Sequence, residues 1–365
     1  MGKRKRLEKK KRKRVRTRDW EKHGEYSFTH DRVKHRRAQV KLPETAEDQQ
    51  PLPMDFTPNA TVIAHSKKWA FVRFAGKERL CLIDERLKPR ERASLLAPGD
   101  RVLVEFEEDE AVVRGVAPRR TRLSRYAGEH GPLQEQVIAA NVDVLVIAAS
   151  AAKPPFRPGL VDRYLIAAQV GGVQPVLCVN KMDLADTEPD EVALYRELGI
   201  PVCLTSCETG AGIDALRPML ANRVSVLAGH SGVGKTSLLH ALDPDISVHT
   251  AEVSEATERG RHTTSAAKLY LLESDTWIID TPGIRALGLW RVSPEEVEYY
   301  FPELAEFARA CKFRNCTHTH EPACAVREGV EAGEISKGRY ESYLRIRASL
   351  EAEDGHTPGR LPGTR

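Results

Sequence analysis

Two short motifs in this chain of 365 residues carry the residue types that bind a nucleotide. Residues 229–236 read Gly-His-Ser-Gly-Val-Gly-Lys-Thr and match the phosphate loop G-x-x-x-x-G-K-[ST]. Its glycines let backbone N–H groups approach phosphate oxygens, its lysine adds a positive charge, and its threonine hydroxyl can ligate Mg²⁺. Residues 180–183 read Asn-Lys-Met-Asp, the N-K-x-D pattern, whose carboxylate can accept hydrogen bonds from the ring N–H and the exocyclic amine of guanine. Together the motifs predict a site for GTP and GDP.

The order of the two motifs is unusual. In an ordinary GTPase the phosphate loop precedes the base-reading motif, whereas here residues 180–183 precede residues 229–236. Both motifs follow apolar, strand-like segments, so both are expected at the carboxyl edge of a parallel sheet, where ligands bind in such folds. Residues 135–288, in which apolar strands alternate with helical patterns, are therefore predicted to form a circularly permuted P-loop GTPase domain of the α/β class.

Three further segments complete the predicted nucleotide site. Asp280-Thr281-Pro282-Gly283 matches D-x-x-G, in which Asp280 holds Mg²⁺ through water and the Gly283 amide senses the γ-phosphate. Residues 260–264 (Gly-Arg-His-Thr-Thr) have loop composition, and Thr264 can complete the Mg²⁺ coordination. Thr205-Ser206-Cys207 fits the loop that backs the base. The predicted nucleotide-binding residues are Asn180, Lys181, Met182, Asp183, Ser206, Gly229, His230, Ser231, Gly232, Val233, Gly234, Lys235, Thr236, Ser237, Thr264 and Gly283.

The residue after Gly283 bears on catalysis. It is Ile284, whereas Ras-like enzymes have a water-positioning glutamine there. Because isoleucine cannot orient water, hydrolysis is expected to be slow or to depend on another group. His262 is the nearest candidate by sequence, and the alternative is that it is only a surface residue of a switch loop. The predicted catalytic residues are His262, Lys235, Thr236 and Asp280, and the predicted magnesium ligands are Thr236 and Thr264.

Three cysteines and a histidine lie close together near the C-terminus. Cys311-x4-Cys316-x-His318-x5-Cys324 offers three thiolates and one imidazole, which suits a closed, structural, tetrahedral Zn²⁺ site. A set of buried free cysteines is the alternative, and buried thiols rarely crowd a polar loop that contains histidine. The residues alone leave open whether His318 or the nearby His320 is the ligand.

The rest of the chain divides by composition. Residues 1–55 are predicted to be a basic, disordered arm, and residues 56–118 a small RNA-binding β-barrel, with an OB-fold favoured over an SH3-like barrel. A linker rich in Gly and Arg is expected at 117–134, a helical zinc-binding domain at 289–353, and a flexible tail at 354–365. The strands expected in the barrel are 60–64, 70–74, 78–83, 101–107 and 111–116.

The excess positive charge lies at one end of the chain. Residues 1–18 hold twelve Lys or Arg and a single acid, Glu8, whereas the whole chain has a net charge of +4. A polyanion would therefore be contacted by the arm rather than by a basic body. Residues 1–42 contain no apolar signal segment, and the longest apolar run, 142–152, is too short to cross a bilayer. The other cysteines are scattered and form no disulfide framework, so a cytoplasmic protein is expected.

The order N-K-x-D, T-S, G-x-x-x-x-G-K-T, G-x-H-T-T and D-T-P-G, followed by C-x4-C-x-H-x5-C, closely resembles the ribosome small subunit-dependent GTPase A family. The resemblance spans about residues 58–350. It implies an OB-fold, a permuted GTPase domain and a C-terminal zinc domain, with a role in late maturation of the small (30S) ribosomal subunit. It also implies rRNA binding and GTP hydrolysis stimulated by that subunit. The family pattern selects His318 as the zinc ligand and aligns His262 with the histidine of a switch motif. The long arm goes beyond the family's usual N-terminus. We expect a monomer without a membrane partner.

Two other functions fit parts of the pattern. A P-loop phosphotransferase would use residues 229–236 as an active site, but the acidic base reader at 180–183 argues against it. A nucleic-acid-binding module with a vestigial nucleotide site is the other, and the intact Lys235, Thr236 and Asp280 argue against that.

Overall fold

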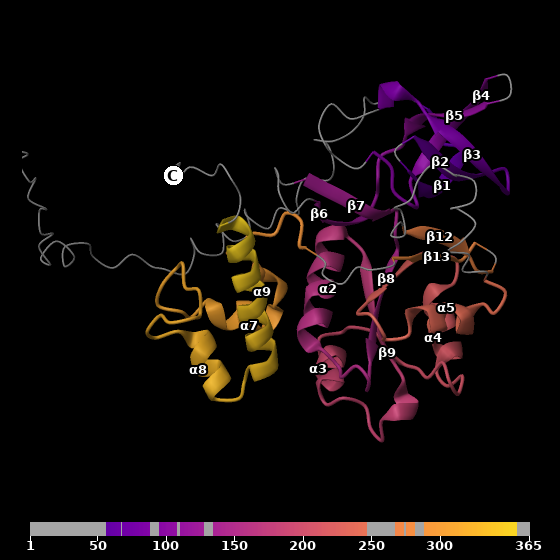
Figure 1. The fold of residues 1–365 in the computed structure, drawn as a ribbon. Helices are drawn as coiled ribbons and strands as arrows, with labels where there is room; N and C mark the ends of the chain where they lie inside the picture. The colour runs from indigo at the N-terminus through magenta and orange to yellow at the C-terminus, as the bar shows by residue number, and fades with distance from the viewer. Residues whose placement is uncertain are drawn as a thin grey trace, which may run out of the picture. The chain divides into compact units, whose positions relative to one another are not determined.

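The computed structural model describes residues 56–66, 68–87, 95–107, 110–127, 134–246, 267–273, 275–281 and 288–355 (Figure 1). The predicted arm, the end of the predicted tail and the segment 260–264 lie outside the described residues. In the described part of the chain, no helix combines the length and the apolar character needed to cross a membrane.

The first five strands form a closed barrel. They join in the order β1-β2-β3-β5-β4, with β1 and β4 paired through Ala60 and Val102, and β3 running parallel to β5. This is the strand order of an OB-fold, so the predicted barrel is confirmed and the SH3-like alternative is not. Alternate side chains such as Val62, Val72 and Val113 fill the interior. The strands are β1 (Ala60–His65), β2 (Trp69–Phe74), β3 (Lys77–Ile83), β4 (Arg101–Glu107) and β5 (Glu110–Val116).

The expected linker at 117–134 is wrong in part, because it contains a strand. β6 (Arg122–Ala127) and β7 (Gln134–Ala140) form an antiparallel two-stranded sheet. Its connection to the barrel is held by a buried ion pair in which Arg119 Nε lies 2.7 Å from Asp100 Oδ1. These tertiary contacts stabilise strands that the arginine-rich composition does not reveal.

The GTPase domain is built on a six-stranded sheet in the order β10-β9-β8-β11-β13-β12. All neighbours are parallel except β12, which runs antiparallel to β13, so the parallel sheet expected from the sequence has one antiparallel edge strand. The strands are β8 (Val144–Ser150), β9 (Gln174–Asn180), β10 (Val202–Leu204), β11 (Val224–Gly229), β12 (Lys268–Leu271) and β13 (Trp277–Asp280).

Helices cover both faces of this sheet, as predicted. Side chains of α2 and α3 belong to one buried apolar cluster, and side chains of α4 and α5 belong to a second one on the opposite face (Figure 1). Central strand β8 is buried along its whole length, which explains its continuous apolar sequence. The helices are α2 (Pro158–Gly171), α3 (Glu191–Glu197), α4 (Ile213–Leu220) and α5 (Lys235–Leu242).

The C-terminal region is helical. It begins with a 3-10 turn, η4 (Val297–Tyr300), followed by α7 (Pro302–Ala308). The break between the two falls at Pro302, which cannot donate a backbone hydrogen bond and favours the first turn of a helix. Two more helices follow, α8 (Ala325–Glu331) and α9 (Lys337–Gly355), the second of which was expected at 334–353.

Helix α9 lies along α2, and a buried polar cluster joins them (Figure 1). The Arg339 guanidinium, 3% exposed, donates to Asp162 Oδ1 and to Glu303 Oε1, both at 2.5 Å. The Tyr195 hydroxyl of α3 donates to the same Asp162 oxygen at 2.8 Å. Burial raises the pKa of Asp162, and the Arg339 charge opposes that rise. The C-terminal helices are thus fixed to the part of the GTPase domain that carries the predicted base reader.

Candidate nucleotide and metal sites

The phosphate loop lies between β11 and α5. Strand β11 ends at Gly229, and helix α5 begins at Lys235. Gly234 has a φ of +96°, and a Cβ there would lie 2.4 Å from the Asn180 side-chain nitrogen. Only glycine allows both this backbone conformation and this close approach. The first backbone N–H groups of α5 point back into the loop, where the positive end of the helix dipole favours an anion.

Two side chains of the base-reading motif hold this loop from behind. Asn180 Nδ2 donates to the Val233 carbonyl at 3.0 Å, and Lys181 Nζ donates to the Gly232 carbonyl at 2.6 Å. In a trans peptide the N–H points opposite to the C=O. Each carbonyl that is held outward therefore turns the next N–H, that of Val233 and that of Gly234, toward the inside of the loop. The loop is preorganised to bind phosphate.

Lys235 and Asp280 lie at the other side of the loop. Lys235 Nζ donates to the carbonyls of Gly229 at 2.9 Å and His230 at 3.1 Å. Burial lowers the pKa of Lys235, and the nearby Asp280 opposes that change. Burial raises the pKa of Asp280, and Lys235 opposes it in turn. Within the described residues, the buried Asp280 Oδ1 has no hydrogen-bond partner. A buried carboxylate oxygen of this kind is a suitable ligand for a Mg²⁺ ion, which prefers oxygen ligands and retains several waters.

The base-reading motif is braced by the loop after β10. Asn180, 1% exposed, accepts hydrogen bonds from Thr205 Oγ1 at 3.2 Å and from the Cys207 backbone N–H at 3.3 Å. Ser206 Oγ donates to Asp183 Oδ1 at 2.5 Å. The Asp183 carboxylate is thus oriented while its other oxygen is left to accept from a ligand. The structure brings the segments 180–183, 205–207 and 229–236 together as the sequence predicted.

Some predicted residues are not placed. His262, Thr264 and Gly283 lie outside the described residues, so the structure does not describe the predicted switch contacts.

The structure adds to the site the segment between β8 and α2, which the sequence motifs did not include. Lys181 Nζ donates to the Lys153 carbonyl at 2.7 Å, and Arg157 contacts His230 of the phosphate loop. Its position after a buried strand, at the carboxyl edge of the sheet, was the available signal.

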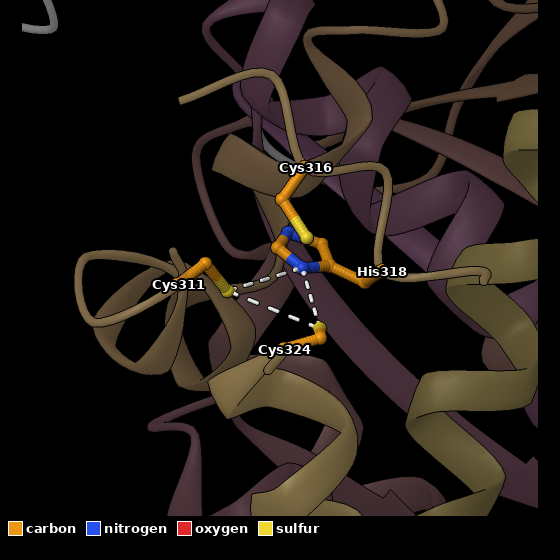
Figure 2. A group of neighbouring side chains, drawn as sticks. All are labelled: Cys311, Cys316, His318 and Cys324. Carbon is orange, nitrogen blue, oxygen red and sulfur yellow. Dashed lines mark hydrogen bonds between the residues drawn. The ribbon is translucent and has the colours of Figure 1, made fainter. Parts of the chain in front are cut away.

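The second candidate site is the group of Cys311, Cys316, His318 and Cys324 (Figure 2). Their ligand atoms all lie within 4.8 Å of one another. His318 Nδ1 is 3.6 Å from Cys311 Sγ and 3.3 Å from Cys324 Sγ, and the two sulfurs are 3.9 Å apart. Tetrahedral Zn²⁺ with ordinary bond lengths requires S···S distances of about 3.8 Å and N···S distances of about 3.6 Å. The donor set and its spacing therefore fit a metal ion.

The surroundings of His318 also fit a metal ligand. Its Nε2 lies 3.0 Å from Glu298 Oε2, a carboxylate contact that orients a ligating imidazole so that Nδ1 faces the cysteines. The Tyr340 hydroxyl of α9 donates to the His318 carbonyl at 2.5 Å and fixes the loop. His320 is exposed and contacts Thr319 instead, so it lies outside the group. Burial raises the pKa of the Cys316 thiol to about 12, a shift that a bound cation would reverse.

Comparison with known proteins agrees with this geometry. The family model described as RsgA GTPase matches residues 116–290. The small ribosomal subunit biogenesis GTPase RsgA of Gemmatimonas aurantiaca is 41% identical over 290 residues, which cover 77% of this chain and 94% of the relative. The protein of the same name from Chlorobaculum tepidum is 39% identical over 284 residues, 75% of this chain and 91% of that one. The chain belongs to the RsgA GTPase family. The family predicted from the motif order is therefore confirmed.

Solved structures of similar proteins have the same fold. YjeQ from Thermotoga maritima superposes with a TM-score of 0.61 at 30% identity, over 80% of this chain and 98% of that one. YloQ, described as a circularly permuted GTPase, superposes with a TM-score of 0.56 at 27% identity, over 83% and 98%. These matches confirm the predicted combination of an OB-type barrel with a permuted RsgA-type GTPase domain.

Proposed function

We propose that this protein hydrolyses GTP as a switch in the late maturation of the small ribosomal subunit. The observation that carries the proposal is the bracing of the phosphate loop by Asn180 and Lys181 of the base-reading motif. Such bracing joins guanine recognition to phosphate binding in one preorganised site. The chain belongs to a family whose relatives are named for small ribosomal subunit biogenesis, which supports a role in that process.

The roles of the site residues follow from their chemistry. Asp183 accepts from guanine, and adenine lacks the matching pair of donors, so ATP would leave the carboxylate unsatisfied. The N–H groups of the loop and Lys235 bind the phosphates, while Thr236 and Asp280 hold Mg²⁺ directly and through water. A bound Mg²⁺ would supply positive charge opposite the negative charge that develops on the phosphates during transfer. Of the residues outside the described part, Thr264 and Gly283 are proposed to contact the γ-phosphate and its metal.

The cysteine and histidine group is proposed to hold one structural Zn²⁺. Four protein ligands fill a tetrahedral ion, which leaves no open position for catalysis. The metal would stabilise the loop between α7 and α8 and so maintain the C-terminal domain. The domain limits 56–118, 135–288 and 289–353 are part of the same proposal.

Hydrolysis by the free protein is proposed to be slow, because Ile284 cannot orient water. The subunit would accelerate it by placing His262 or an rRNA group near the attacking water. An added transition-state contact of this kind can increase the rate about a thousandfold or more. The barrel and the basic arm would contact rRNA in the cytoplasm, and the protein would act as a monomer.

The test is single-turnover GTP hydrolysis with and without purified small subunits, with large subunits as the control. We expect a steep increase with small subunits only, and its loss in Lys235→Met at unchanged melting temperature. A free protein that is already fast and gains nothing from subunits would contradict the proposal. A phosphorylated small molecule formed in place of free phosphate would favour the phosphotransferase.

A further inference from the structure

A third carbonyl of the phosphate loop is also held by a side chain, in this case that of His230 within the loop itself, which Arg157 of another segment contacts in turn. His230 Nδ1 lies 2.7 Å from the Ser231 carbonyl oxygen, and His230 Nε2 lies 3.1 Å from Arg157 Nη1. A guanidinium can only donate, so Nε2 must be the acceptor and the ring hydrogen must be on Nδ1. His230 therefore donates to Ser231, and Arg157 selects the tautomer that allows it.

The contact of His230 with the Ser231 carbonyl orients the backbone N–H of Gly232. Because the Ser231 carbonyl is held outward, the N–H of Gly232 in the same trans peptide points to the inside of the loop. Three consecutive carbonyls are thus held from behind, and each aims the next N–H at the phosphates. The three pairs of holding side chain and held carbonyl are His230 with Ser231, Lys181 with Gly232, and Asn180 with Val233.

The backbone that presents Arg157 is itself firmly held. Arg157 is the residue that precedes α2, and the Tyr195 hydroxyl lies 3.1 Å from the Pro158 carbonyl oxygen in the first turn of that helix. The same hydroxyl contacts the buried Asp162, which Arg339 neutralises. Arg157 and His230 also line one small pocket between the phosphate loop and α2. The guanidinium is therefore presented from a fixed support, although the side chain itself is exposed.

We propose that Arg157 is a positioning residue for GTP hydrolysis, acting through His230 on the Gly232 N–H that contacts the phosphates. The inference rests on the proposed GTPase function. It adds the segment between β8 and α2 to the nucleotide site. It also gives a role to His230, which occupies a position where the phosphate motif allows any residue. Loss of one such hydrogen bond in an exposed setting is expected to lower the rate about twofold to tenfold.

Isosteric replacements separate the two contacts of His230. The amide nitrogen of asparagine can take the place of Nδ1, so His230→Asn keeps the donor to Ser231 and loses the contact with Arg157. Glutamine extends to the position of Nε2, so His230→Gln keeps the contact with Arg157 and loses the donor to Ser231. If the Ser231 contact matters, His230→Asn lowers the rate less than His230→Gln does.

The experiment measures GTP affinity, single-turnover hydrolysis at saturating GTP and melting temperature in the full chain. Arg157→Met should lower the single-turnover rate by about twofold to tenfold with an unchanged melting temperature, and Arg157→Lys, which keeps a donor, should recover part of it. In the His230→Asn background, Arg157→Met should have no further effect. Arg196→Met is the matched control, because Arg196 is an exposed arginine of the same domain that pairs with Glu188.

Each outcome decides between the alternatives. A rate in Arg157→Met equal to that in Arg196→Met would refute the positioning role while leaving the GTPase function intact. A full effect of Arg157→Met in the His230→Asn background would also refute it, because Arg157 would then act without His230. A wild-type protein that binds no GTP would refute the proposed function and this inference with it.

Discussion

Removing the Arg339 guanidinium is expected to destabilise the whole folded unit. Asp162 is completely buried, and within the described residues Arg339 is the only positively charged group hydrogen-bonded to it, so Arg339→Met leaves a carboxylate without its counter-ion. Removing one partner of a buried ion pair lowers the free energy of unfolding by about 3–5 kcal/mol. At about 2–4 °C per kcal/mol for a domain of this size, the melting temperature should fall by about 6–20 °C. Methionine keeps much of the side-chain volume, so the loss of stability should result from the missing charge rather than from poorer packing.

The loss of stability in Arg339→Met is expected to change with pH in a definite direction. Burial already raises the pKa of Asp162, and without Arg339 that pKa should rise further, because nothing then opposes the desolvation. A carboxyl whose folded-state pKa is raised favours the folded state when it is protonated. The loss of stability in Arg339→Met should therefore be small at pH 5 and grow as the pH rises to 8.

The assay is thermal unfolding of wild-type and variant proteins at several pH values. The double variant Arg339→Met with Asp162→Asn is the control, since it removes the buried charge and keeps an oxygen that can accept from Tyr195. It should be more stable than Arg339→Met alone at pH 8. Equal stability of the two variants at every pH would refute the assignment of the loss to an unpaired Asp162.

Three other predictions concern the two candidate sites. Asp183→Asn should weaken GTP binding by about 1.5–3 kcal/mol, the value of a hydrogen bond to a charged group, and should raise the relative affinity for a xanthine nucleotide; equal GTP affinity by calorimetry would exclude this base reader. Gly234→Ala should abolish GTP binding, because the new Cβ would lie 2.4 Å from Asn180 Nδ2 at a φ of +96°, and retained binding would mean that the loop can rearrange freely. Elemental analysis should find one Zn²⁺ per chain, lost in Cys316→Ser and kept in His320→Ala; metal that is lost in His320→Ala but kept in His318→Ala would make His320 the ligand.

The sequence predicts best the features that short contiguous segments specify. Residues 224–242 predict a strand, a turn and a helix in succession, and the pair of motifs predicts the permuted order of the domain. The spacing of the cysteines likewise brings four ligands into one loop, although only the structure separates His318 from His320.

Features that depend on distant contacts were missed for a physical reason. The β6–β7 sheet carries no clear apolar alternation, and its connection to the barrel depends on the ion pair of Arg119 with Asp100. Arg157 and His230 are 73 residues apart and belong to no common motif. Polar side chains of this kind have no periodicity of their own, so the fold must be known before their partners can be found.

The contact of Asp162 with Arg339 has a consequence for synthesis of the protein. The two residues are 177 positions apart, and the carboxylate is made first. At a synthesis rate of about 5–20 residues per second, the nascent chain contains Asp162 for about 9–35 s before Arg339 exists. During that interval the outer face of α2 has neither its counter-ion nor the helix that covers it. This face is therefore the one on which a chaperone would act, and a chain cut short before Arg339 would be a substrate for proteolysis even though every nucleotide motif had been translated.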